Sequence, residues 1–438
     1  MGSSGRNPLL ALPLILGLAL GTAAAQPAGT GQPGSQDLES LKKTAVKVYL
    51  DCGFCDVEYI KTEITYVNYV RDRKEAQVHV LVTTQSTGSG GREYTMTFIG
   101  QNEFAGCDDV QKYFSNKTDT EDEVRVGLVN SLKLGLMSYV ARTPISSRLS
   151  VRFTAPPAAA EARDRWDYWV FSANLSGRFS GEESYKSVST DLSLSANRVT
   201  PASKIRLGFS TDYSKSVFKY EDETITGKRH GWYGTGLFVK SLGEHWSAGF
   251  YLDSESSTYS NTDLSLAVAP AIEFNAFSYS QSTRRQLRFL YRAGMNAVRY
   301  IEETIYFKTR ETLWQQSLSV NLDLREKWGT VSVSVSGSNY FHDFSKNRLN
   351  VFGIVSVNVV KGLNVYALGG GAKIHDQLSL PRAGLSYEDV LLRQKELATT
   401  YSYFFSFGLQ FSFGSIFTNV INPRFGRAGG RSMSVMIF

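Results

Sequence analysis

The chain has 438 residues, of which 42% are hydrophobic and 13% aromatic, and its formal net charge is +6. This length accommodates one small domain beside a larger one. A helical membrane protein would need apolar runs of about 20 residues, and none occurs after residue 25. No block of Lys and Arg stands out, so the charge does not predict nucleic-acid binding.

Residues 1–25 are typical of a secretory signal peptide. Arg6 supplies the positive start, residues 9–20 form the apolar centre, and three alanines precede an expected cleavage near Gln26. The alternative is a helix anchored in the inner membrane, but the apolar centre is too short to span as a helix. Residues 26–43 are predicted to be a flexible leader because they are rich in Pro, Gly and Gln.

Residues 44–154 are predicted to form a small α+β domain. Alternating residues at 77–84 and 93–99, joined by the Gly-rich stretch 87–91, indicate a β-hairpin. Asp56 is placed to cap a helix that runs to Ile64. Thr120 and Glu123 predict a capping box for a second helix through about residue 141. Residues 148–153 are compatible with a further strand.

Cys52 and Cys55 form a C-x-x-C pair at the start of this domain. Three hypotheses were open: a structural disulfide or inert thiols, a redox pair, and half of a metal site. A redox pair lacks the flanking Trp or Pro of thioredoxin-like enzymes, and a metal site would have to recruit Cys107 and His79. We favour a structural disulfide or inert thiols, and we expect no metal and no cofactor.

Residues 155–165 have the composition of a linker, and residues 166–413 alternate apolar and polar side chains in about twelve segments. Such alternation predicts an all-β transmembrane antiparallel barrel with apolar residues toward lipid. Trp166, Tyr168 and Trp169 suit an aromatic belt at its inner edge. In the fourth segment the outward positions are predicted to be Tyr233, Leu237 and Val239.

The links between these segments alternate in length. Short turns at 197–201, 242–245, 325–327 and 361–362 alternate with longer links at 215–227, 254–261, 299–311, 342–346 and 374–400. Short periplasmic turns and longer outer loops are typical of outer-membrane barrels. The long segment 275–284 leaves the count open by two strands. The last outer loop is predicted to hold a helix at 386–397.

Charged residues fall on the predicted lumen face of the barrel. Because isolated charges are costly in a low-dielectric interior, they are expected to pair. They form either a network that fills a narrow barrel, which we favour, or the lining of a selective pore. The predicted lumen charges are Arg178, Asp191, Arg206, Asp212, Asp253, Glu273, Arg288, Arg292 and Asp323.

The last strand, residues 401–413, has an almost strict alternation of large apolar and polar residues. Within it Ser406, Gly408, Phe411 and Phe413 resemble the C-terminal assembly signal of bacterial outer-membrane barrels. That resemblance implies recognition by the barrel-insertion machinery. The signal usually ends the chain, whereas here residues 414–438 follow, predicted to be a periplasmic tail.

The strand pattern, this signal and the loop pattern over residues 166–425 resemble the uncharacterised salt-stress-induced outer-membrane protein family. The resemblance implies a location in the bacterial outer membrane, in contact with its lipid, with the N-terminal domain in the periplasm. It implies no biochemical activity.

We therefore predict an envelope-scaffolding protein whose N-terminal domain docks a periplasmic partner. The alternatives are a porin-like diffusion channel for small solutes and an outer-membrane hydrolase. We do not expect an enzyme, because no histidine of the barrel region precedes the Ser-Asn pair of outer-membrane phospholipases. We predict no catalytic residue and no nucleic-acid partner.

Overall fold

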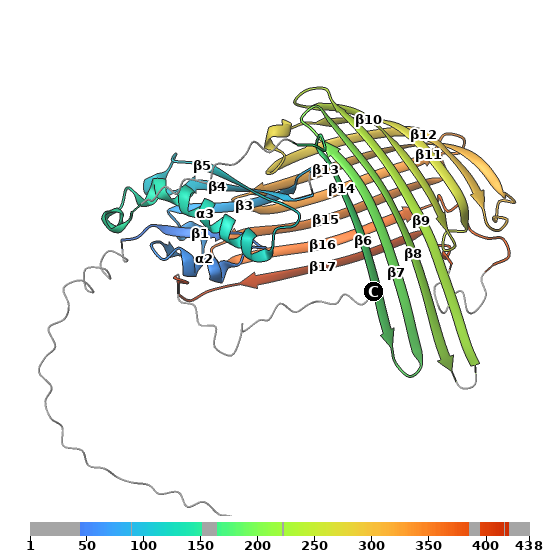
Figure 1. Cartoon of the computed structure of the whole chain (residues 1–438), viewed down its shortest axis with the longest axis horizontal. Helices are drawn as coiled ribbons and strands as arrows, with labels where there is room; N and C mark the ends of the chain where they lie inside the picture. The colour runs from blue at the N-terminus through green and yellow to red at the C-terminus, as the bar shows by residue number, and fades with distance from the viewer. Residues whose placement is uncertain are drawn as a thin grey trace, which may run out of the picture.

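The computed structural model describes residues 44–88, 90–150, 164–220, 223–384, 395–415 and 417–419. These residues form an N-terminal domain with a five-stranded sheet and a separate twelve-stranded sheet, arranged as Figure 1 shows. The predicted signal peptide, the leader, residues 155–163 of the linker, residues 386–394 of the predicted loop helix and residues 420–438 of the tail lie outside the described residues.

The N-terminal domain has its sheet strands in the order β2-β1-β3-β4-β5, with β1 parallel to both of its neighbours. The predicted hairpin is confirmed as β3–β4. In chain order the elements are β1 (Lys47–Asp51), α2 (Val57–Glu63), β2 (Asn68–Tyr69), η1 (Arg73–Glu75), β3 (Val78–Ser86), β4 (Arg92–Gly100), η2 (Asn102–Phe104), β5 (Asp109–Ser115), α3 (Glu121–Val140) and η3 (Pro144–Arg148).

Both predicted helix caps are present. The Asp56 carboxylate accepts a hydrogen bond from the Tyr59 amide, and Thr120 and Glu123 form the complete capping box. Strands β2 and β5 were not predicted, because one is two residues long and the other carries polar residues. A 3-10 helix occupies residues 144–148, where the predicted strand was to begin.

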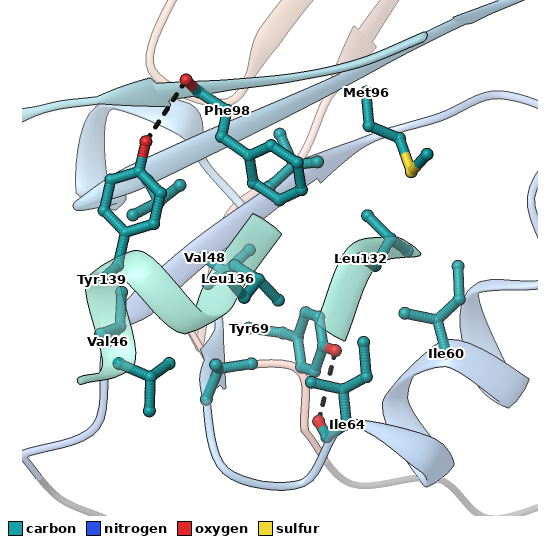
Figure 2. Packing of buried hydrophobic residues seen from close by; sticks show 14 of the residues in the cluster. Val46, Val48, Ile60, Ile64, Tyr69, Met96, Phe98, Leu132, Leu136 and Tyr139 are labelled. Carbon is teal, nitrogen blue, oxygen red and sulfur yellow. Dashed lines mark hydrogen bonds between the residues drawn. The ribbon is translucent and has the colours of Figure 1, made fainter. Parts of the chain in front are cut away.

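The domain core lies between the sheet and helices α2 and α3, as Figure 2 shows. Leu132 and Leu136 of α3 are each 2% exposed and belong to the same buried cluster as Val48 of β1 and Phe98 of β4. The approach of helix to sheet is close, since a Cβ at Gly135 would lie 2.2 Å from the Phe98 ring. The Tyr139 hydroxyl donates to the Phe98 carbonyl at 3.4 Å.

Cys52 and Cys55 are joined by a disulfide directly after β1. Cys107 is free, and the Arg142 guanidinium donates to its sulfur at 3.0 Å. Within the described ranges no group of three or more His, Cys, Asp or Glu side chains could hold a metal ion.

The second sheet is an antiparallel meander in which each strand pairs with the next in the chain, so the predicted count of twelve is confirmed. Its strands are β6 (Trp169–Gly181), β7 (Tyr185–Val199), β8 (Ser203–Tyr220), β9 (Glu223–Ser241), β10 (Trp246–Ser257), β11 (Thr262–Asn275), β12 (Arg285–Tyr300), β13 (Arg310–Glu326), β14 (Gly329–Tyr340), β15 (Asn347–Val360), β16 (Leu363–Ile374) and β17 (Tyr401–Phe411). The long link after β11 contains only the 3-10 helix η4 (Tyr279–Gln281).

Two predictions about β8 and β9 were wrong. Residues 215–220 and 223–227 are not a loop, because β8 and β9 stay paired as far as Tyr220 and Glu223. Tyr233, Leu237 and Val239 do not face outward: Tyr233 pairs with Ser210, and Trp232 and Phe238 share the outer face with Leu207 and Phe250. Gly234 and Gly236 on the outer face of β9 interrupt the alternation, which is why the sequence pattern misled.

Strands β6 and β17 are the two ends of the sheet and do not pair with each other in this structure. Both are exposed along most of their length. No helix in the described part of the chain is long and apolar enough to cross a membrane.

Candidate functional sites at the domain-side rim and on the lumen face

The turns 200–202, 242–245, 276–284, 327–328 and 361–362 lie at one end of the twelve-stranded sheet, which we call the domain-side rim. The N-terminal domain lies at this end (Figure 1). The Asp72 carboxylate accepts a hydrogen bond from the Gly362 amide at 2.7 Å, and Arg73 donates to the Asn358 carbonyl at 3.1 Å. Glu75 and Lys361 form an ion pair beside them. Three polar contacts thus fix η1 and its cap to the end of β15 and the β15–β16 turn.

The chain beyond β17 makes a second attachment. Phe417 forms an antiparallel bridge with Val70, and the Thr418 amide donates to the Tyr69 carbonyl at 3.0 Å. The Tyr69 amide donates to the Asn419 side chain at 2.6 Å, and the Lys61 ammonium donates to the Thr418 carbonyl at 2.6 Å. Burial lowers the pKa of Lys61. Residues 417–419 therefore occupy the edge that β2 would otherwise leave open.

A third contact lies at the tip of the β3–β4 hairpin. A Cβ placed on Gly88 would lie 2.4 Å from the Val199 Cβ, so the tip touches the end of β7. β7 is next to the end strand β6, whereas the β15–β16 turn and residues 417–419 are near the other end strand. The domain thus contacts the rim close to both unpaired ends of the sheet.

Rim residues such as Asp72 were not identified in the sequence. Asp72 is 9% exposed, and its carboxylate also accepts from the Lys74 amide at 2.9 Å as the cap of η1. In the sequence, an Asp that precedes a short polar segment predicts a helix cap. It does not predict a contact with a segment almost 300 residues away.

All nine predicted lumen charges lie on one face of the sheet, as the strand register requires. Asp191 is directly opposite Asp212, and Glu273 is opposite Ser247. Most partners are neutral hydroxyls: Tyr233 donates to Asp253 at 3.1 Å, Tyr279 to Glu273 at 2.9 Å and Ser332 to Asp323 at 2.7 Å.

Ion pairs among these nine residues are scarce. Within the described residues only Arg288 and Asp323 come within pairing distance, at 3.9 Å. Arg292 instead lies over the Tyr251 ring at 4.8 Å and donates to Ser317. The nine charges therefore do not form the continuous network expected of a filled interior.

Two cavities open on the lumen face. One, of about 500 Å³, lies beside the domain-side rim and is lined by Lys204, Arg206, Glu273 and Arg288. The other, of about 710 Å³, lies toward the opposite end and is lined by Arg178, Asp191, Asp212 and Arg229. Six of the nine predicted lumen charges thus line one of these two cavities.

The residues of the assembly signal divide between the two faces of β17. Phe411 and Phe413 are 62% and 79% exposed. Ser406 and Gly408 belong to the opposite, lumen-facing row, in which Gly408 pairs with Tyr366. A Cβ on Gly408 would lie 2.2 Å from the Tyr366 ring, so the glycine leaves the space that this ring fills.

The outer face of the sheet is apolar over its whole width and exposed on most of its strands. The row continues through paired residues from strand to strand, as in Phe238 beside Phe250 and Tyr291 beside Leu318. Exposed members of this face include Leu175, Leu194, Leu207, Phe238, Phe250, Val268, Tyr291, Leu318, Val351 and Phe407.

No protein-family model and no curated protein matches this chain. Among solved structures, the translocator domain of the autotransporter NalP from Neisseria meningitidis has 10% sequence identity, and 56% of this chain and 80% of that chain are covered at a TM-score of 0.16. The β-domain of the Bordetella autotransporter BrkA has 14% identity, with 56% and 98% covered at a TM-score of 0.22. TM-scores this low do not establish a common arrangement of strands.

Replacing Asp72 by Ala should loosen the domain from the rim. The change removes a hydrogen bond to a carboxylate, which contributes about 1.5–3 kcal/mol, so amide exchange at Gly362 and Thr418 should accelerate roughly tenfold or more. Hydrogen exchange of the full chain in detergent, read by mass spectrometry, measures this.

The matched control is Lys74→Ala, two residues away, since the Lys74 side chain is exposed and only its amide contacts Asp72. This variant should exchange like the wild type. Equal exchange in the Asp72 variant and the wild type would show that this contact does not hold the domain.

Proposed function

We propose that this chain is an integral outer-membrane β-barrel protein that holds its N-terminal domain against the periplasmic rim of the barrel and presents it to a periplasmic partner. The observation that carries the proposal is the three-part attachment of the domain to the rim. A domain attached to the barrel through its linker alone would not need residues 417–419, which follow the last barrel strand, to bond to its β2 edge.

The outer face supports the membrane location. Contiguous exposed apolar patches on soluble monomers rarely exceed a few hundred Å², whereas here the apolar row extends from β6 to β17 and has exposed members on most of these strands. The lumen face of the same strands carries charges and hydroxyls. Apolar outside and polar inside is the pattern of transmembrane barrels. The predicted signal peptide and the residues of the assembly signal are consistent with export and insertion.

A barrel in lipid has no open edge, because unpaired backbone groups are too costly in hydrocarbon. β6 runs away from the domain-side rim and β17 runs toward it, so pairing between them would be antiparallel like every other pair in the sheet. We propose that these two strands close the barrel in the membrane.

The docking surface for a partner is best sought on β5. Residues 417–419 already occupy the β2 edge, so β5 is the remaining free edge of the domain sheet. Val110 and Phe114 of β5 are 51% and 57% exposed on one side of this strand. An edge strand with exposed apolar side chains favours a partner that adds a β-strand.

Closure of the barrel is tested with pairs of cysteines in the outward rows of β6 and β17, introduced in a Cys107→Ser background. In antiparallel pairing the residue numbers of linked positions have a constant sum. If Ala173→Cys links to Phe407→Cys, then Leu175→Cys should link to Phe405→Cys. Oxidation in outer membranes of producing cells, read on non-reducing gels, checks both pairing and location.

A constant sum, whatever its value, is the expected result. Linkage at scattered sums, or no linkage at any combination of positions in the two rows, would contradict a closed barrel.

Partner docking is tested with a photo-crosslinking amino acid in place of Phe114, compared with the same substitution at Leu134. Leu134 is 66% exposed on helix α3 and serves as a control of similar exposure. Irradiation of intact cells should give a discrete adduct from position 114 and none from position 134. Adducts at both positions, or at neither, would contradict docking on β5.

A diffusion channel is the second candidate, because the lumen charges are gathered around open cavities and are scarcely paired with one another. Planar bilayer recording of the purified protein separates the two functions. The scaffolding proposal predicts no stepwise current for the wild type. Reproducible unitary steps that vanish when the protein is heat-denatured would favour the channel instead.

A further inference from the structure

The cavity at the domain-side rim has a composition that the proposed function does not require. It has a volume of about 500 Å³, and its lining comes from the β7–β8 and β9–β10 turns and from strands β8 to β12. Three cationic side chains line it: Lys204 and Arg206 from β8, and Arg288 from β12. Since β8 and β12 are four strands apart in the sheet, these charges are brought together only by its curvature.

The three cations are poorly compensated by the protein. In the described part of the chain the side chains of Lys204 and Arg206 make no hydrogen bond and no ion pair. Arg288 has its carboxylate neighbour, Asp323, at 3.9 Å, and its buried Nε has no hydrogen-bond partner.

Two acidic residues also line the cavity, and both are engaged by hydroxyls. Glu273 accepts from the Tyr279 hydroxyl at 2.9 Å, and Glu244 accepts from Ser278 on the rim. Among the lining residues three cations stand against two carboxylates, so the lining itself has a net positive charge, and Asp323 outside the lining pairs with Arg288 at 3.9 Å.

Like charges around a half-buried cavity repel one another more strongly than in water, and an anion between them removes that repulsion. Guanidinium groups bind phosphate and carboxylate through two parallel N–H···O bonds. Hydroxyls of Ser203 and Tyr251 line the same cavity and can donate to further oxygens, whereas Thr200 already donates to the Ser203 carbonyl and Ser247 is bonded to Tyr279. The volume lies within the range of about 300–1,000 Å³ that is usual for small-molecule sites.

We propose that this cavity is a binding site for a small solute that carries phosphate or carboxylate groups. Lys204, Arg206 and Arg288 neutralise the anion, and the surrounding hydroxyls orient it. The site lies directly inside the rim, where Val199 lines the cavity and also touches Gly88 of the N-terminal domain. The solute would therefore enter from the side of the N-terminal domain.

Calorimetric titration of the folded full chain in non-ionic detergent tests the site. Inorganic pyrophosphate represents phosphate ligands and citrate represents carboxylate ligands, each measured against sodium chloride at equal ionic strength. We expect saturable binding of one equivalent of at least one of the two probes, and the tighter probe identifies the chemical class.

Arg206→Ala and Arg288→Ala should each weaken this binding roughly tenfold or more, because each removes a charge-assisted hydrogen bond. Arg206→Lys should recover part of the loss, and Arg206→Gln replaces the Ala variant if that protein does not fold. Arg178→Ala, on the same face but in the other cavity, is the matched control and should bind like the wild type.

The absence of saturable binding by both probes would overturn the proposal. So would equal affinity in the wild type and in both arginine variants, or an equal loss in Arg178→Ala, since either result would mean general attraction to a charged interior. None of these outcomes depends on partner docking or on ion conduction.

Discussion

The backbone groups at the edges of the two sheets are the constraint on which the rest of the structure depends. A strand at the edge of a sheet presents a row of N–H and C=O groups without partners, and proteins cover, pair or blunt such edges. This chain has four sheet edges. One of them, on β2, is paired by residues 417–419 of the same chain. The edges of β6 and β17 are complementary in direction, and that of β5 carries exposed Val110 and Phe114.

Residues beyond the predicted assembly signal supply the pairing at β2. A barrel whose last strand ended at Phe413 would have nothing to place on the β2 edge. The few residues that follow turn back to the domain, where backbone and side-chain hydrogen bonds to Tyr69 and Asn68 hold them. The continuation that looked like a departure from the usual signal thus has a structural use.

Much of the fold could be predicted from the sequence because alternation is a local property. Strands with one apolar and one polar face were placed correctly wherever large residues alternate with Ser, Asn or charged residues, as in β13 and β17. The prediction was wrong in β9, where glycines occupy outward positions. Leu207 and Leu252 lie close to Gly236 from the neighbouring strands, so the outer face stays apolar without an apolar residue there. The apolar surface at this position comes from the neighbouring strands and cannot be predicted from the residues of β9 alone.

The candidate sites were less accessible to sequence reasoning. The nine lumen charges were assigned to one face because alternate residues of a strand share a face. Alternation cannot show that Lys204 and Arg206 meet Arg288 across four strands. Lys204 was also not among the predicted residues. Likewise nothing near Asp72 indicates that its carboxylate will meet the Gly362 amide. Both features depend on how far the sheet curves and on where the domain lies against it, which are properties of the whole chain.

One of the contacts between the domain and the rim lies beside the cationic cavity, and the charges of the contacting residues suit this position. The hairpin tip at Gly88 contacts Val199, and Val199 lines the cavity that holds the excess positive charge. Glu75 and Asp72, by contrast, place negative charge against the β15–β16 turn near the other end of the sheet. The domain therefore presents two acidic residues, with Arg73, to one part of the rim and an uncharged glycine to the part beside the cations. An acidic hairpin tip at position 88 would compete with an anion for the same arginines, whereas the glycine leaves their charge available.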